Sequence, residues 1–311
     1  MSETNKRNEH GKRAVQTTGH SWDGDLQEYN NPIPRWWLWA FYATVVFAVV
    51  YWFLYPAWPV GGTYTKGVMN TITYTGPGGE ERTTHWNTRA LLMRDMQEGT
   101  HAVRQREYLE RVAAMSYNEI ADDPDMMAFS RSVARGLFAD NCAACHQVGG
   151  GGVPGVYPNL ADDDWLWGGT FERIEETIRE GRRGFMPAFP QFNARQLDDL
   201  ASYVLSLSGH SVDADAAARG DDIFNGPTGG CMYCHGEGGT GGPAQGAPNL
   251  TNGLWQIVDV PSAPTLEGKK ALVKRVVSEG AQRHMPTFQD RLSDAEIRAL
   301  AVYVHSLGGG Q

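Results

Sequence analysis

The feature that most constrains the fold of this chain is an internal repeat that begins near residue 126. Four sequence blocks occur twice, in the same order and at similar spacing. The matched blocks are ARGLFADNCAACH (134–146) with ARGDDIFNGPTGGCMYCH (218–235), PNLADDDW (158–165) with PNLTNGLW (248–255), REGRRGFMPAF (179–189) with SEGAQRHMPTF (278–288), and LDDLASYVLSLSG (197–209) with IRALAVYVHSLGG (297–309). Such a repeat indicates two copies of one domain. We expect the copies at residues 126–209 and 213–309, each reading as helix, attachment loop, helix, methionine-bearing loop and C-terminal helix.

Each copy carries two cysteines separated by two residues and followed at once by a histidine. These residues are Cys142, Cys145 and His146 in the first copy, and Cys231, Cys234 and His235 in the second. The C-x-x-C-H pattern is typical of a covalently attached c-type haem, because two thiols one short turn apart can add to the two porphyrin vinyl groups while the histidine reaches the iron. A thioredoxin-like dithiol would need a strand-to-helix turn, and a four-thiolate zinc site would have to join pairs 89 residues apart. The repeated motif therefore favours two haems.

A methionine at matching positions is the expected second axial ligand of each iron. Met186 and Met285 are both followed by proline and, two residues further on, by phenylalanine. His284 precedes Met285 directly, but it aligns with Phe185, which cannot bind iron. His–Met coordination raises the potential of a haem relative to bis-histidine coordination. The sequence leaves open whether the copies exchange ligands, although one haem per copy is the simpler arrangement.

Other residues shared by the copies suggest the rest of a haem pocket. The carbonyl groups of Pro158 and Pro248 can accept a hydrogen bond from the ligating imidazole, although both prolines also suit an ordinary turn. Gly136 and Gly220 would let the first and last helices of each copy cross closely. Arginines that precede the methionines could pair with haem propionates, and two tryptophans at matching positions could hydrogen-bond them, although both kinds of residue also suit ordinary surface and packing roles. These side chains are Arg182, Arg183, Arg283, Trp165 and Trp255.

Residues 36–58 form an uncharged, apolar segment of 23 residues. As a helix rising about 1.5 Å per residue, it would cross a hydrocarbon core of roughly 30 Å. Tryptophan and tyrosine side chains gather at both ends, as they do at membrane interfaces. The segment is too long, and starts too late, for a cleaved signal peptide. The expected fold is therefore mainly α, with one N-terminal transmembrane helix followed by two tandem cytochrome c-type helical domains.

The segment between the apolar helix and the repeats contains no motif with a recognisable chemical role. We expect a loop with possible short strands over residues 59–85, and mostly helix over residues 87–120 with Asn87 or Thr88 as N-cap. Pro124 suits the start of the next helix. The formal net charge of −9 argues against a general nucleic-acid partner.

These motifs resemble those of membrane-anchored di-haem cytochromes c. With the segment NNPIPRWWLWAFYATVVFAVVYWFLYPAWP (30–59), they resemble subunit III of the cbb3-type cytochrome c oxidases, in which an Asn-Pro-x-Pro-Arg-Trp-Trp pattern enters a membrane helix and two cytochrome c domains follow. The likeness covers nearly the whole chain. It implies electron relay through two covalently attached, His–Met-ligated haems, from a soluble periplasmic cytochrome c to the mono-haem subunit and then to the catalytic haem–copper subunit. It also implies a proton-translocating complex whose oxygen-reducing site is not in this chain.

The resemblance also implies a topology, because c-type haem is attached outside the bacterial cytoplasm. We expect a cytoplasmic segment at 1–35, a single pass through the inner membrane and contact with its lipid at 36–58, a periplasmic spacer at 59–125, and both haem domains in the periplasm. Two alternatives remain. One is an electron-carrier subunit of a dehydrogenase or nitric oxide reductase. The other is a di-haem peroxidase, which needs an open or displaceable iron site, whereas both copies offer a methionine.

Overall fold

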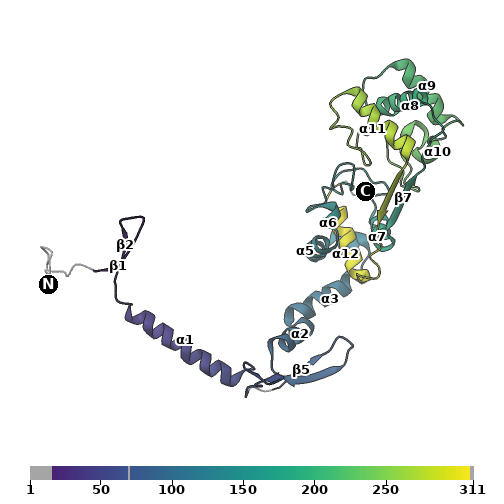
Figure 1. The fold of residues 1–311 in the computed structure, drawn as a ribbon. Coiled ribbons are helices and arrows are strands. Elements are labelled where there is room, and N and C mark those ends of the chain that lie inside the picture. The colour runs from purple at the N-terminus through teal and green to yellow at the C-terminus, as the bar shows by residue number, and fades with distance from the viewer. Residues whose placement is uncertain (1–15, 69–70, 309–311) are drawn as a thin grey trace. The chain divides into compact units, whose positions relative to one another are not determined.

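The computed structural model describes residues 16–68 and 71–308, so residues 1–15, 69–70 and 309 of the predicted segments lie outside the described residues. The chain divides into two compact units, Met1–Val103 and Arg104–Gln311 (Figure 1). The first unit holds the apolar helix and three hairpins, and the second holds both sequence copies.

The apolar segment forms one helix, α1 (Arg35–Leu54), with a mean hydropathy of 1.8 and no buried residue. It is long and apolar enough to cross a membrane. The helix ends four residues earlier than the predicted segment, because Tyr55 precedes Pro56 and adopts an extended conformation. The chain then turns back, and the rings of Trp52 and Trp58 lie 4.7 Å apart between centroids.

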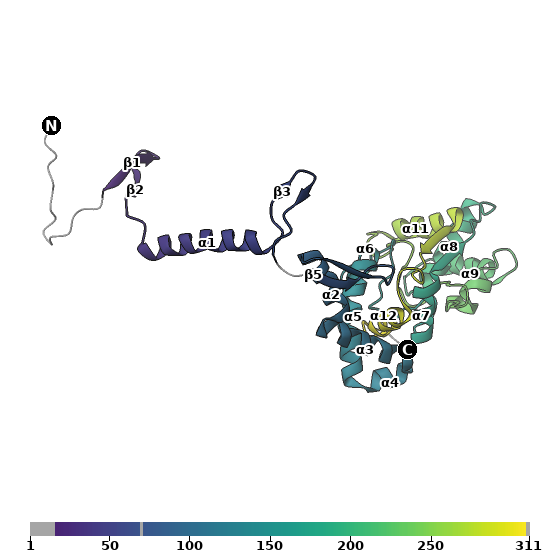
Figure 2. The same cartoon turned by 90° about the horizontal axis from the view of Figure 1, so that it is seen from below.

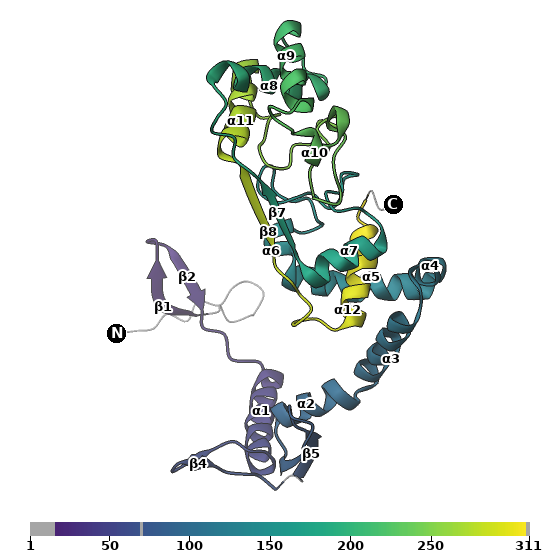
Figure 3. The ribbon, with the colours of Figure 1, turned by 90° about the vertical axis from the view of Figure 1, so that its right-hand side faces the viewer.

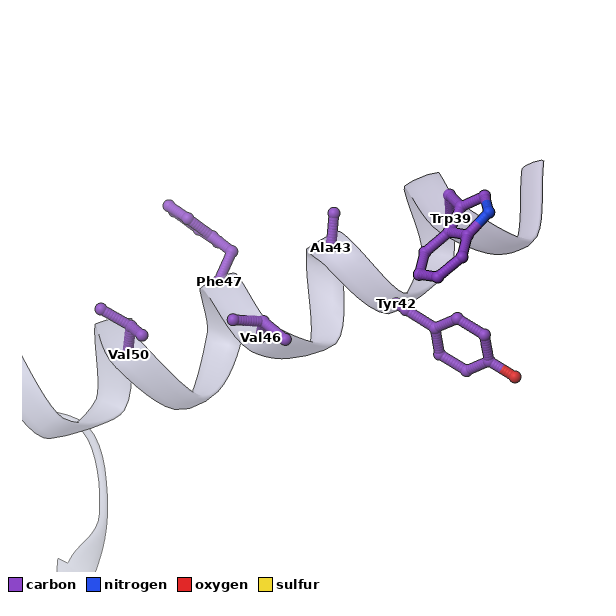
Figure 4. A pocket seen from close by; sticks show the side chains of 6 residues that line it. All are labelled: Trp39, Tyr42, Ala43, Val46, Phe47 and Val50. Carbon is purple, nitrogen blue, oxygen red and sulfur yellow. The ribbon is translucent and has the colours of Figure 1, made fainter. Parts of the chain in front are cut away.

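A shallow apolar hollow lies along α1. It is lined by Trp39, Tyr42, Ala43, Val46, Phe47 and Val50 (Figure 4). The small side chain of Ala43 leaves space between its larger neighbours, as Figure 4 shows. Lipid tails or another membrane helix can fill such a hollow, as is expected for a helix that is apolar all round.

The rest of the first unit consists of short antiparallel hairpins and a helix. The hairpins pair β1 (Thr17–Trp22) with β2 (Leu26–Tyr29), β3 (Pro59–Val60) with β4 (Thr63–Tyr64), and β5 (Thr71–Thr75) with β6 (Glu81–His85). The hairpins β3–β4 and β5–β6 confirm the expected short strands. Helix α2 (Thr88–Glu98) begins at the expected N-cap, because the Asn87 side chain accepts a hydrogen bond from the Ala90 N–H at 2.8 Å.

The second unit is mostly helical, as predicted. Its elements, with α3 crossing the boundary between the units, are α3 (Thr100–Ala114), α4 (Tyr117–Asp122), α5 (Pro124–Asn141), α6 (Ala143–His146), α7 (Phe171–Glu180), β7 (Arg182–Met186), α8 (Ala194–Leu207), α9 (Ala214–Asn225), α10 (Met232–His235), η1 (Glu237–Gly239), α11 (Leu266–Glu279), β8 (Ala281–Met285) and α12 (Asp294–His305). Pro124 opens α5, as expected, where its missing N–H has no intrahelical partner to lose.

The two copies exchange their last helices. In what we call the first core, α12 of the second copy packs against α5 and α7 of the first copy (Figure 3). In the second core, α8 of the first copy packs against α9 and α11 of the second copy (Figure 2). Phe138 and Leu300 are among the buried side chains of the first core. Leu200 and Phe224 are among those of the second core. Each copy, 126–209 and 213–309, thus contributes to both cores.

The segments that precede the methionines form a two-stranded antiparallel ribbon between the cores (Figure 1). In its register, Met186 lies opposite Ala281, and Arg182 lies opposite Met285. The expectation of a loop at these positions was wrong. Each strand finds its hydrogen-bonding partner in the other copy, and the pattern within one copy does not contain this long-range pairing.

The two glycines differ in whether they face the neighbouring helix. A Cβ atom on Gly220 would lie 2.1 Å from the carbonyl oxygen of Asp199, so α9 and α8 are in backbone contact at this glycine. A Cβ on Gly136 would meet nothing within 4 Å, so the expectation of a glycine-dependent crossing was wrong for the first core. Gly136 is exposed on α5, and the buried Ala134 stands at the position of that helix that Gly220 occupies in α9.

Candidate haem-binding sites

The two C-x-x-C-H motifs form matching single helical turns, α6 and α10. The His146 N–H donates to the Cys142 carbonyl at 2.9 Å, and the His235 N–H donates to the Cys231 carbonyl at 3.0 Å. In each motif the first cysteine is half-buried and the second is exposed, and all four are free thiols. One turn of helix thus holds two thiols at the edge of a pocket and directs the following imidazole inwards.

Both imidazoles are held by a backbone carbonyl, as the sequence suggested. Nδ1 of His146 lies 3.1 Å from the Pro158 oxygen, and Nδ1 of His235 lies 3.1 Å from the Pro248 oxygen. Donation from Nδ1–H leaves Nε2 with its lone pair free for a metal. Burial lowers the pKa of both imidazoles, which favours the neutral, ligating form.

The inner thiols lie in an apolar environment. Burial raises the pKa of the Cys142 thiol to about 11, and the same cause raises that of Cys231 to about 11. Such thiols stay protonated at neutral pH and do not behave as the low-pKa thiolates of a redox dithiol. Among the residues that the structure describes, no three or more histidine, cysteine, aspartate or glutamate side chains are grouped so that they could hold a metal ion.

Each methionine packs beside the cysteine motif of the other copy. Met285 lies against the first core together with Cys142. Met186 lies against the second core together with Cys231. The exchange of helices and the ribbon bring each methionine to the core that holds the first cysteine of the other copy.

The strand geometry separates Met285 from its neighbour. Successive side chains of a strand point to opposite faces, so Met285 and His284 cannot both face the first core. Met285 packs on that core, whereas His284 is exposed and lies opposite Arg183 in the ribbon. The structure gives His284 no place near either attachment motif.

The arginines expected near haem propionates have protein partners. Arg182 donates to Glu176 and to Thr177, both at 2.9 Å, and lies over the Trp167 ring. Arg283 donates to the Gly155 carbonyl of the first copy and, at 3.4 Å, to the Ile257 carbonyl of the second. These contacts tie the loops of the two copies together. Arg183 is exposed, and Trp165 and Trp255 pack against the first and second cores.

Two known protein families match the sequence, one around the apolar helix and one over the two copies. Residues 14–62 match the N-terminal domain of cytochrome oxidase-cbb3, FixP, and residues 132–204 and 215–304 match cytochrome C oxidase, cbb3-type, subunit III. The chain belongs to the subunit III family of cbb3-type cytochrome c oxidases. The second match covers both cores and both cysteine motifs. Subunit III membership implies haem c as cofactor, other oxidase subunits as partners, and a place in an oxidoreductase complex.

Similar proteins align with nearly the whole length of this subunit III chain. It is 40% identical over 314 residues to the cbb3-type cytochrome c oxidase subunit FixP of Azorhizobium caulinodans, with 97% of this chain and 96% of the relative aligned. It is 39% identical to subunit CcoP of Azospirillum brasilense, with 96% of each chain aligned, and 38% identical to subunit CcoP of Cereibacter sphaeroides, with 95% of each aligned. The membrane helix α1 fits the anchoring expected of an oxidase subunit.

Proposed function

We propose that this chain is the electron-entry subunit of its oxidase and holds two covalently attached haems c with crossed His–Met ligand sets. His146 and Met285 would hold one haem at Cys142 and Cys145. His235 and Met186 would hold the other at Cys231 and Cys234. One-electron transfer is the chemistry that haem supplies when bound.

The observation that carries the crossed assignment is the composition of the two cores. Met285 shares its packing with Cys142, and Met186 shares its packing with Cys231. Covalent attachment fixes one edge of a haem near the cysteines, so the methionine packed in the same core is the one within reach. The half-buried thiols, the carbonyl-bound imidazoles and the apolar side chains around them fit a haem group at each site.

Single-haem variants test the assignment. In the full chain, Cys231→Ala with Cys234→Ala removes the second attachment site and leaves one haem at Cys142 and Cys145. In that background, Met285→Ala is expected to convert the haem to high spin, while Met186→Ala leaves it low spin. The readout is the optical and electron paramagnetic resonance spectrum of the purified protein. The reverse pattern would assign one complete ligand set to each copy.

The reciprocal background is the matched control. With Cys142→Ala and Cys145→Ala, the remaining haem is expected to depend on Met186 and not on Met285. Either background alone decides between crossed and uncrossed sets, so a variant that accumulates poorly does not leave the question open. If neither methionine affects the spin state in either background, His–Met ligation itself is wrong.

The wider role follows from family membership and from the membrane helix. Electrons would come from a soluble periplasmic cytochrome c and pass to the mono-haem subunit, and oxygen reduction coupled to proton translocation would take place in the haem–copper subunit. Residues 1–35 would be cytoplasmic, and the residues after α1 periplasmic. Alkaline phosphatase fused after Gly308 should be active, whereas a fusion before α1 should not.

The alternatives predict other partners and another reactivity. Purification of the tagged chain from membranes should recover the haem–copper subunit, and recovery of a dehydrogenase instead would contradict the oxidase role. A peroxidase would need an open iron site. Peroxide turnover by the isolated chain, with a high-spin signal before any mutation, would support that class.

A further inference from the structure

The two exchanged helices carry opposite charges at the same position of the repeat. Asp198 of α8 corresponds to Arg298 of α12 when LDDLASYV is matched with IRALAVYV. The helices that pack against α12 and α8, which are α7 and α11, carry the opposite charges at matching positions. Aligning Gly181 with Gly280 places Glu175 of α7 at the position of Lys274 in α11. Each C-terminal helix therefore carries a charge that complements the core of the other copy.

In the second core, Asp198 is bound by two lysines of α11. Its two carboxylate oxygens lie 2.8 Å from Nζ of Lys270 and 2.9 Å from Nζ of Lys274. Lys270 is only 6% exposed. A buried ammonium group is stable only with a paired acceptor, so this site requires an acidic residue on the helix that fills it.

In the first core, Arg298 supplies donors to two backbone carbonyl oxygens and a cation to an aromatic ring. Its guanidinium donates to the carbonyl oxygens of Val112 and Met115, at and just beyond the C-terminal end of α3. It also lies over the ring of Tyr117, whose hydroxyl donates to Glu175 at 2.6 Å. An ion pair between Arg179 of α7 and Asp294 of α12 also joins α12 to the first core.

The uncrossed arrangement would reverse the charges that Asp198 and Arg298 meet. Asp198 on the first core would face Glu175 and the carbonyl oxygens at the end of α3, so acceptors would meet acceptors. Arg298 on the second core would face the two lysines. Like charges at such distances in a half-buried site repel, and each would also lose its present partner.

We propose that Asp198 and Arg298 are positioning residues that direct each C-terminal helix to the core of the other copy, and thereby determine which methionine reaches which attachment motif. The helix assignment stands on the contacts above. Its consequence for the haems rests on the ligand sets proposed in the preceding subsection. Hydrophobic side chains alone do not separate the two arrangements, because α8 and α12 present similar apolar faces.

Charge reversal with rescue tests the pairing without reference to the haems. Asp198→Lys in the full chain should lower the thermal unfolding midpoint by on the order of 10 °C, the size expected for losing a half-buried ion pair. Adding Lys270→Glu and Lys274→Glu should restore at least half of that loss. Failure of the triple variant to recover would overturn the proposed role of Asp198.

Asp199 provides a matched control on the same helix. It is buried and ion-paired with Arg219 of α9 at 2.8 Å, whereas the lysines of α11 pair with Asp198. Its loss therefore removes an ion pair on α8 that does not involve α11. Asp199→Asn should lower the midpoint, and the lysine reversals on α11 should not rescue it.

The exchange itself is tested by swapping the two charges. Asp198→Arg combined with Arg298→Asp is made in the single-haem background Cys231→Ala with Cys234→Ala. The methionine whose loss gives a high-spin haem should change from Met285 to Met186 in a measurable fraction of molecules. Unchanged and complete dependence on Met285 would overturn the proposal. If neither methionine matters even with the native charges, the ligand proposal fails while the rescue series still tests the pairing.

Discussion

Alanine in place of Gly220 and alanine in place of Gly136 are expected to change stability in opposite directions. In the second core, a Cβ on Gly220 would lie 2.1 Å from the Asp199 oxygen and 2.7 Å from Cβ of Tyr203, whereas ordinary contact begins at 3.4 Å. Both neighbours belong to the backbone region of α8, so no side-chain rotation can relieve the clash. The helices must separate by roughly 1 Å, which a close-packed core resists.

The expected magnitudes follow from two opposing contributions. Forced separation of packed helices costs about 1–3 kcal/mol or more. Alanine in place of a helical glycine returns about 0.5–1 kcal/mol. The net effect is a loss of about 1–2 kcal/mol for Gly220→Ala. At Gly136 a Cβ meets nothing within 4 Å, so Gly136→Ala should gain about 0.5–1 kcal/mol. For a unit of this size, each kcal/mol moves the unfolding midpoint by about 2–4 °C.

Thermal unfolding of the full chain, followed by far-ultraviolet circular dichroism, measures both effects. The midpoint should fall for Gly220→Ala and rise for Gly136→Ala. Equal shifts in the same direction would refute the reasoning, because a Cβ would clash at Gly220 and meets nothing at Gly136. The double variant should show the sum of the shifts, since the two glycines share no neighbours.

Three further outcomes are expected. Hydrogen bonds from Arg182 hold the pKa of Glu176 at about 2, below its usual 4.5. This depressed pKa contributes stability that is lost as pH falls from about 4.5 towards 2. Arg182→Gln should therefore flatten the acid side of a plot of unfolding midpoint against pH. Gly181 has a φ of +71°, and a Cβ on it would lie close to the Met285 carbonyl oxygen, so Gly181→Ala should raise the high-spin fraction of one haem while both haems stay attached. Arg298→Met should expose the end of α3 and speed proteolysis near residues 112–116, because two carbonyl oxygens lose their donor.

Local signals predicted much of the fold from the sequence. The membrane helix follows from an uncharged run, and its end at Tyr55 follows from Pro56. The start of α2 follows from the Asn87 cap, and the attachment turns follow from C-x-x-C-H. The proline carbonyls beside the imidazoles also lay within reach of sequence reasoning, because the distance along the chain is short and the same in both copies.

The exchange of helices could not be predicted from hydrophobic pattern. The copies share their apolar positions, so the pattern fits α8 equally well to either core, and only unequal positions can separate the two arrangements. Asp198 and Arg298 were the available signal, since they stand in matched blocks with opposite charge. The strands β7 and β8 form only through pairing between the copies, which a reading of either copy alone does not contain.

The exchange of helices also fixes the order in which this protein can mature. The first core lacks its last helix until α12 has been synthesised, and residues 181–293 lie between α7 and that helix. At about 5–20 residues per second, synthesis of this stretch takes on the order of ten seconds. During that time the first cysteine motif has left the ribosome, but its core is incomplete because α12 is missing. The proposed attachment of a haem at this motif would therefore have an interval of open access that a domain completed within one copy would not provide.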